Sequence, residues 1–247
     1  MYESKLSSGY LFHYTNSLDT LISIIENGFY PRCAIEDVHF ALPGLTNEQS
    51  KMGIPMVCFC DIPLALSAFH RSQYGQYGIA LSKEWGIKHG IAPVHYVIEN
   101  SANNNAFINL ERFIQHIIDN YENLCHKTNT PFDKDELTIE TVKIMFELLG
   151  NYKQYSDDNM TKLYYDEREW RYLVPFYEDN SQEISNRLSY NELNDNRVKI
   201  FNDEMAKRYK LTFNIDDICQ IILPCQKDID VLCNKFSINK DIVQVVK

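Results

Sequence analysis

Two short stretches, far apart in the chain, combine residue types that can do chemistry. The first, Tyr10–Thr15, brings a histidine and two hydroxyl side chains to the end of an expected strand, directly before a helix. The second, Tyr165–Arg171, carries two glutamates separated by one residue. If the two stretches meet in the fold, they join an imidazole to paired carboxylates. The helix start after the first stretch favours a phosphate-bearing ligand. A carboxylate of the second stretch could stabilise a developing positive charge.

Glu167 and Glu169 fall two residues apart on an expected strand that runs from Leu163 to Val174. Strand side chains alternate, so both carboxylates and Arg171 are expected on one face, with the glutamate Cα atoms about 7 Å apart. Like charges placed in this way raise the pKa of one group unless a cation relieves them. Two interpretations stay open: a carboxylate aimed into a cleft, or an edge strand carrying glutamate–arginine ion pairs.

His13 also has two interpretations. A lone histidine in an apolar strand is usually a hydrogen-bonded core residue, but His13 stands at a strand end beside Tyr14 and Thr15. The start of the following helix offers unpaired amides and a positive dipole, which favour an anionic ligand. The position favours a ligand site and says nothing about a reaction.

The elements that position these residues begin with a strand–helix unit. Residues 9–15 are expected as a strand, and apolar side chains at helical spacing follow between an N-cap at Ser17 and a terminal Gly28. Residues 29–54 hold prolines and glycines without a clear period, which indicates a long loop. Later strands are expected at residues 56–60, 78–81, 93–98, 218–223 and 242–246.

Helical periodicity replaces strand patterns in the middle of the chain. Residues 110–121 and 142–149 predict a helical hairpin, inserted at about 105–160 of a single domain that spans residues 1–247. Short helices are also expected near 202–209 and 228–236. Strands outnumber helices and do not alternate with them, so the predicted fold class is α+β.

Composition narrows the class of protein. Hydrophobic residues make up 45% of the chain, enough for a packed core. No apolar run reaches the roughly 18 residues of a membrane span, and no signal peptide pattern is present, so a cytoplasmic protein without membrane association is expected. The net charge of −10 disfavours nucleic acid as a partner, because such binding depends on Lys and Arg. The seven cysteines and seven histidines show no metal-ligand spacing, so no metal site is expected.

Motifs spread over nearly the whole chain carry a family resemblance. They are Leu11–Thr15, Ile25–Gly28, Val57–Leu64, His70, Tyr74–Leu81, Trp85–Gly86, Pro93–Val97 and Glu169–Arg171. With these motifs the sequence resembles the AbiGi family, whose members are named as antitoxin components of an abortive phage-resistance system. The resemblance implies a phage-defence or toxin–antitoxin role, with a cognate toxin or another defence protein as partner.

More distantly, the early histidine segment and the late strand glutamate are similar to the ADP-ribosyltransferase superfamily. That resemblance implies a split, mixed or antiparallel sheet core with flanking helices, and NAD as the substrate. By the same resemblance, His13 would hydrogen-bond a ribose of NAD, with Tyr14 and Thr15 beside it in the binding site.

The superfamily resemblance also implies catalytic roles. Glu169 would hold the nicotinamide ribose, Glu167 would activate an acceptor, and Phe59 or Tyr77 would lie against the nicotinamide ring. Cleavage of the nicotinamide bond passes through an oxocarbenium-like ribosyl cation, which a carboxylate stabilises. The implied activity is transfer of ADP-ribose from NAD to a macromolecule. The alternative is a non-enzymatic antitoxin or sensor that binds a partner protein.

Overall fold

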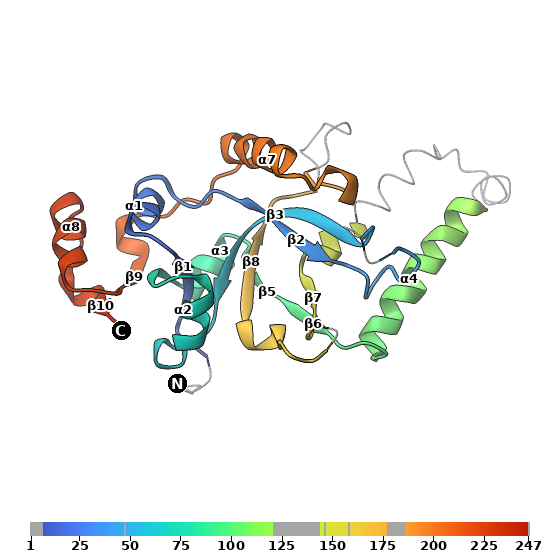
Figure 1. Cartoon of the computed structure of the whole chain (residues 1–247), viewed down its shortest axis with the longest axis horizontal. Coiled ribbons are helices and arrows are strands. Elements are labelled where there is room, and N and C mark those ends of the chain that lie inside the picture. The colour runs from blue at the N-terminus through green and yellow to red at the C-terminus, as the bar shows by residue number, and fades with distance from the viewer. Residues whose placement is uncertain are drawn as a thin grey trace.

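The computed structural model describes residues 7–46, 48–120, 144–145, 147–157, 159–176 and 186–246. These residues form an eight-stranded sheet and a separate two-stranded sheet, with helices packed around them (Figure 1). The large sheet has the order β10-β9-β4-β1-β3-β8-β5, and β2 pairs with β3 off this path. Within the described residues, no helix is both long enough and apolar enough to cross a membrane.

β1 (Tyr10–Thr15) and α1 (Leu18–Asn27) form the strand–helix unit that the sequence predicts. The hydroxyl of Ser17 caps α1 by accepting a hydrogen bond from the backbone N–H of Thr20 at 3.1 Å. Gly28 ends the helix with a φ of 80°, a conformation that glycine adopts without strain. The predicted start and end of the helix are therefore confirmed.

The large sheet divides at β1. This strand pairs with β4 (Tyr77–Ser82) along its whole length, but it meets β3 (Lys51–Cys60) only where Phe12 lies opposite Cys60. The two strands then diverge, and β2 (Arg32–Asp37) takes over the pairing with β3. An opening is left in the sheet where β1, β2 and β3 separate.

The long loop predicted over residues 29–54 is wrong, because β2 and the first half of β3 form a β-hairpin there. Gly53 was one of the residues that suggested a loop, but it stands inside β3. A Cβ atom on Gly53 would lie 2.7 Å from the sulfur of Cys33 and 2.9 Å from the Cβ of Leu188. This glycine therefore permits close packing within a strand rather than a turn.

β8 (Glu169–Leu173) is shorter than the strand predicted over residues 163–174. Tyr164–Glu167 form a 3₁₀ turn, and Arg168 follows with a φ of 44°. A left-handed residue cannot continue an extended strand, so the chain changes direction between the two glutamates. The prediction that these glutamates share one strand is wrong.

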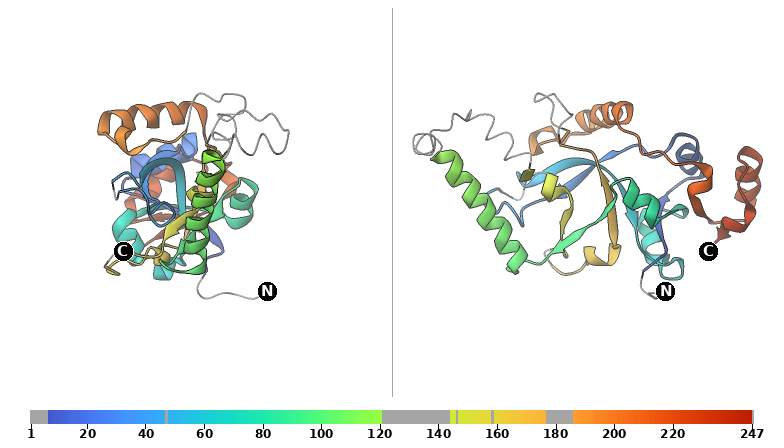
Figure 2. Two further views of the ribbon diagram at one scale, coloured as in Figure 1. Left: turned by 90° about the vertical axis from the view of Figure 1, so that its right-hand side faces the viewer. Right: turned by 180° about the vertical axis from the view of Figure 1, so that it is seen from behind.

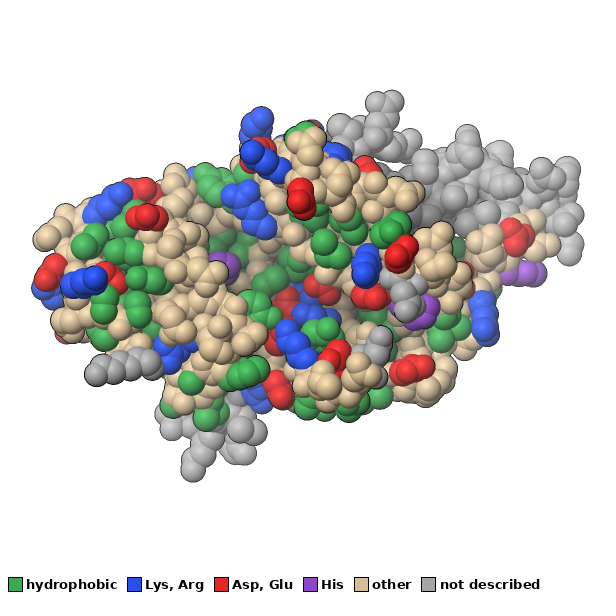
Figure 3. Space-filling view, viewed as in Figure 1, with side chains coloured by type: hydrophobic (Ala, Val, Ile, Leu, Met, Phe, Trp, Pro, Cys, Tyr) green, Lys and Arg blue, Asp and Glu red, His purple; other side chains and the backbone are tan. Residues whose placement is uncertain are grey.

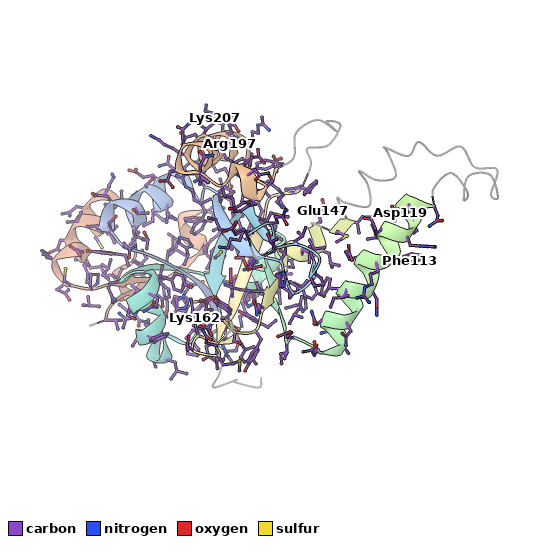
Figure 4. The ribbon with its side chains drawn as sticks, turned by 45° about the vertical axis from the view of Figure 1, so that its right-hand side comes forward. Phe113, Asp119, Glu147, Lys162, Arg197 and Lys207 are labelled. Atoms are coloured by element: carbon purple, nitrogen blue, oxygen red, sulfur yellow. The ribbon has the colours of Figure 1, made fainter. Side chains whose placement is uncertain are left out.

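In the small sheet, which lies between the large sheet and α4 (Figure 1), β6 (His95–Val97) pairs in parallel with β7 (Tyr152–Gln154). Between these strands the chain forms α4 (Ala102–Asp119), the first helix of the predicted hairpin. The second predicted helix lies partly outside the described residues, although residues 144–145 and 147–149 are helical. Phe113 on α4 is 60% exposed and points away from the sheet (Figure 4).

The remaining elements cover the sheet or extend it. The longest of them, α7, lies against β2 and begins earlier than the helix predicted near 202–209, because Asn194 caps it by accepting from the N–H of Arg197. β9 and β10 pair in parallel, which makes the sheet mixed. α4 and α8 stand at opposite ends of the long axis (Figure 2). The fold is α+β, as predicted. The bounds are α2 (Ala68–Tyr74), α3 (Lys83–Lys88), β5 (Ala92–Pro93), α7 (Asp195–Arg208), β9 (Ile218–Leu223), α8 (Lys227–Lys235) and β10 (Val243–Val245).

Candidate functional site

A cavity of about 250 Å³ lies where β1 and β3 diverge. β1 contributes His13 and Tyr14 to its wall, β3 contributes Phe59, and β8 contributes Glu169. The two stretches singled out in the sequence therefore meet in space on adjacent parts of one sheet. The other lining residues are Phe12, Ala34, Glu36, Cys58, Cys60, His70, Tyr74, Lys153 and Glu167.

Two of the predicted site residues lie elsewhere. Thr15 and Tyr77 are register partners at the ends of β1 and β4, and neither belongs to the lining of this cavity. The hydroxyl of Tyr77 donates to the Oδ2 atom of Asp228 at 3.1 Å, near the start of α8. Thr15 shares the face of His13 but stands two residues further along β1, which places it beyond the cavity.

His13 has a defined tautomer. Its Nδ1 atom lies 2.8 Å from the carbonyl oxygen of Cys58, and a carbonyl can only accept, so Nδ1 carries the ring proton. Burial lowers the pKa of His13 despite this hydrogen bond, and the imidazole is neutral near pH 7. The ring packs on Phe29 and Phe59, with centroids 5.1 and 5.8 Å away. Nε2 is therefore a hydrogen-bond acceptor on a firmly held ring.

Glu169 is fixed by Arg171, which has an exposed fraction of 0%. The Nε atom of Arg171 donates to Oε1 of Glu169 at 2.8 Å, and Nη2 donates to Oε2 at 3.1 Å. The same guanidinium donates to Glu36 at 2.9 Å and to the carbonyl oxygen of Gly150 at 2.9 Å. Arg171 thus ties β8 to β2 through two carboxylates.

Lys153 joins the two glutamates of the predicted pair. Its Nζ atom lies 2.8 Å from Oε2 of Glu167 and 3.0 Å from Oε2 of Glu169. Burial alone would lower the pKa of Lys153, but Glu169, Glu36 and Glu167 raise it, so the ammonium is charged. The shared cation brings Glu167 to the cavity although it does not lie on β8.

Glu167 has two further partners. The Tyr74 hydroxyl donates to its Oε1 atom at 2.6 Å, and Nζ of Lys162 lies 2.8 Å from the same atom. Burial would raise the pKa of Glu167, but Lys153, Lys162 and Tyr74 together lower it. Cations therefore offset the repulsion between the two glutamates, so that neither pKa is raised. Both carboxylates are ionised near pH 7.

The electrostatics of the cavity centre on Glu169. Burial would raise its pKa, but Arg171, Lys153 and a hydrogen bond from the Cys58 thiol lower it to about 2. The same burial, together with the charge of Glu169, raises the pKa of Cys58 well above its usual value, so this thiol is not a thiolate nucleophile. Charged side chains of both signs gather around a hollow near the centre of the face in Figure 3.

Four residues that line the cavity were not predicted from the sequence as part of the site. Glu36 lies in the segment predicted as a loop, and Lys153 lies in a polar stretch without any pattern. His70 and Tyr74 come from α2, with ring centroids 4.5 Å apart. Both belong to the motifs of the family resemblance, but neither was predicted to line the site. The role of Lys153 could not be predicted, because it depends on β7 of the small sheet lying beside the large sheet.

Comparison with known proteins gives one family and one relative. The model of the family described as "Putative abortive phage resistance protein AbiGi, antitoxin" matches residues 27–224. This range includes β2, β3 and β8 and begins after β1. A protein named "Abortive phage resistance protein AbiGi", from Lactococcus lactis subsp. cremoris, is 30% identical over 169 residues. The match covers 61% of this chain and 64% of that relative. No solved structure matches the chain.

Proposed function

The chain belongs to the AbiGi family, and from that membership and the geometry of the cavity we propose that it is a phage-defence protein with an ADP-ribosyltransferase-like NAD cleft. The observation that carries the proposal is the meeting of His13 and Glu169 in one cavity, with Phe59 packed edge to face against the imidazole. His13 and Glu169 are far apart in the sequence. Both line the opening that is left where β1 and β3 diverge.

The chemistry of the cavity supports a ribosyl ligand. Nε2 of His13 is an acceptor for a ribose hydroxyl, and Glu169 supplies an ionised carboxylate for a ribosyl cation. A volume of about 250 Å³ is below the range of roughly 300–1,000 Å³ usual for larger ligands, so the cavity fits one half of a dinucleotide. The nicotinamide riboside half is the one that needs the carboxylate.

Lys153 must move away from Glu169 before a ribose hydroxyl can bind there. The oxygens of Glu169 already accept hydrogen bonds from Arg171, Lys153 and Cys58. Arg171 is fully buried, whereas Lys153 reaches in from β7 of the small sheet. A ribose hydroxyl that binds Glu169 therefore displaces Lys153, which keeps its second partner, Glu167.

Radiolabelled NAD tests the proposed activity. The full chain is incubated with NAD, alone and with an extract of phage-infected cells, and released nicotinamide and labelled macromolecules are measured. The proposal predicts turnover by the wild type and by His89→Gln, and its loss in His13→Gln. His89 is a matched control, because its Nδ1 atom also bonds a carbonyl at 2.8 Å, that of Trp85, outside the cavity. Absence of both turnover and binding in every condition would sink the proposal.

A second candidate is a non-enzymatic antitoxin that binds a partner protein. The word "antitoxin" in the description of the family favours it, and the net charge of −10 suits a basic partner surface. Co-expression with the protein encoded next to it tests this candidate. A stoichiometric complex that forms equally well with His13→Gln would assign the function to a surface rather than to the cavity.

A further inference from the structure

One edge of β2 carries backbone groups that point away from the sheet. The N–H of Val38 donates to the carbonyl oxygen of Ser50 at 3.0 Å, which continues the β2–β3 ladder by one pair. Hydrogen-bonded and outward-facing positions alternate in an antiparallel pair. The N–H and C=O groups of Cys33, Ile35 and Asp37 therefore point away from β3.

At Cys33, the first of these outward positions, the N–H has a partner among the residues that the structure describes. The N–H of Cys33 donates to the side-chain oxygen of Asn202 on α7 at 2.7 Å. Over the part of the chain that the structure describes, the outward backbone groups of Ile35 and Asp37 have no hydrogen-bond partner. An open strand edge of this kind is a template for an added strand.

The open edge borders a groove. A hollow of about 300 Å³ lies between Ile35 and Asp37 of β2 and Gln154 of β7. It shares Lys153 with the cavity of His13, and it shares Asp37 and Gln154 with a further hollow of about 350 Å³. The three hollows therefore follow one another along β2.

The groove has an acidic character. The carboxylates of Asp37 and Glu99 line it, both residues are exposed, and neither has an ion-pair partner among the residues described. Ile35, which is 58% exposed, adds an apolar contact on the same strand. Charge complementarity selects Lys and Arg side chains over acidic ones, since like charges across an interface are costly.

We propose that the open edge of β2 binds an extended basic segment of a partner protein, which joins the large sheet as an added strand. Backbone hydrogen bonds to Ile35 and Asp37 supply affinity in this mode of recognition, and side chains of alternating residues supply specificity. Lys and Arg side chains of the segment pair with Asp37 and Glu99. The inference goes beyond the NAD cleft and rests only on the second candidate function, the binding of a partner protein.

The test uses three labelled ten-residue peptides and the full chain. One alternates Lys with Val, one alternates Glu with Val, and one has the basic sequence with a central Pro. Fluorescence anisotropy measures affinity, and hydrogen exchange measures protection of the Ile35 and Asp37 amides. Only the uninterrupted basic peptide is expected to bind and to protect these amides. Charge without strand addition would leave them unprotected.

Variants separate the edge from general charge. Ile35→Pro removes an outward N–H without breaking a β2–β3 bond, and Asp37→Lys reverses a charge; each is expected to weaken binding at least tenfold. Glu84→Lys, an exposed acid on α3, is the matched control and is expected to bind like the wild type. Circular dichroism confirms that each variant is folded. No binding to the wild type, equal binding of the Pro-interrupted peptide, or equal binding by Ile35→Pro overturns the inference. Because no probe contains a nucleotide, the result is independent of the NAD proposal.

Discussion

Arg171 holds Glu169 by two hydrogen bonds, of 2.8 Å from Nε to Oε1 and 3.1 Å from Nη2 to Oε2. This bidentate contact fixes the rotamer of the carboxylate at the cavity wall. Glu36 and Lys153 extend it to β2 and β7, so one network of charges joins both sheets around the split. Glu169, which is proposed to bind the ligand, is therefore also part of the network that joins the strands around the cavity.

Removal of Arg171, the buried cation of this network, is predicted to destabilise the protein strongly. Arg171→Met leaves the buried Glu169 and the partly buried Glu36 without their guanidinium, which is expected to lower the free energy of unfolding by about 3–5 kcal/mol. Urea denaturation measures the change. Arg197→Met is the control, because Arg197 forms ion pairs with half-exposed partners on the surface, at 3.4 and 3.8 Å, and its loss is expected to cost at most about 1 kcal/mol. Equal effects of the two substitutions would contradict the role assigned to Arg171.

Gly75 is predicted to be indispensable at the junction of α2 and β4. Its φ is 125°, and a Cβ atom there would collide with the backbone carbonyl of Thr15 on β1. Gly75→Ala is therefore expected to destabilise the protein by at least about 2 kcal/mol, through strain and the steric clash. Gly44→Ala is the control, because an added Cβ there has nothing within 4 Å. Thermal unfolding of both variants checks the prediction; a wild-type melting temperature for Gly75→Ala would contradict it.

Local sequence patterns were enough to predict some elements. They failed where contacts between residues far apart in the sequence decide the structure. Ser17 and Gly28 were readable because a helix cap depends on neighbours within one turn. Gly53 led to the wrong prediction of a loop. Its lack of a side chain serves close packing against Leu188, which is remote in the sequence. The prediction of the glutamate strand failed at Arg168, whose left-handed conformation has no sequence signature.

The site was partly predictable for the same reason. His13 and Glu169 stood out because each belongs to a polar pattern inside a strand, and the structure places both in one cavity. Thr15 and Tyr77 satisfied the same kind of pattern, but the register of β1 and β4 puts them beyond the opening. Lys153 reaches the glutamates only because β7 lies beside the large sheet, which no local pattern encodes.

Stability is predicted to fall as the pH is lowered, in two stages. The folded pKa of His13 is below its ordinary value of 6.5, so the unfolded chain takes up the proton first and stability is lost as pH falls below about 6.5. The folded pKa of Glu169 is about 2 against 4.5, so its contribution is present above about pH 4.5 and is lost as pH falls from there toward 2. Unfolding free energies from urea titrations between pH 7.5 and 2 measure both stages.

A histidine variant separates the first stage from the second. His13→Gln is expected to flatten the loss of stability between pH 7 and 5, while His70, whose pKa burial also lowers, keeps part of that slope. The steeper loss below pH 4.5 is expected to remain, because Glu169 is unchanged. A wild type whose stability is constant or increases from pH 7.5 to 5 would be inconsistent with a buried neutral His13.

The most direct test of the central claim is a calorimetric titration of NAD into the folded full chain, compared among the wild type, His13→Gln and His89→Gln. If His13 and Glu169 form one NAD cleft, the wild type and His89→Gln bind NAD with the same affinity, and His13→Gln binds at least tenfold more weakly. Equal NAD affinity in all three proteins, or no heat of binding in the wild type, would contradict the claim.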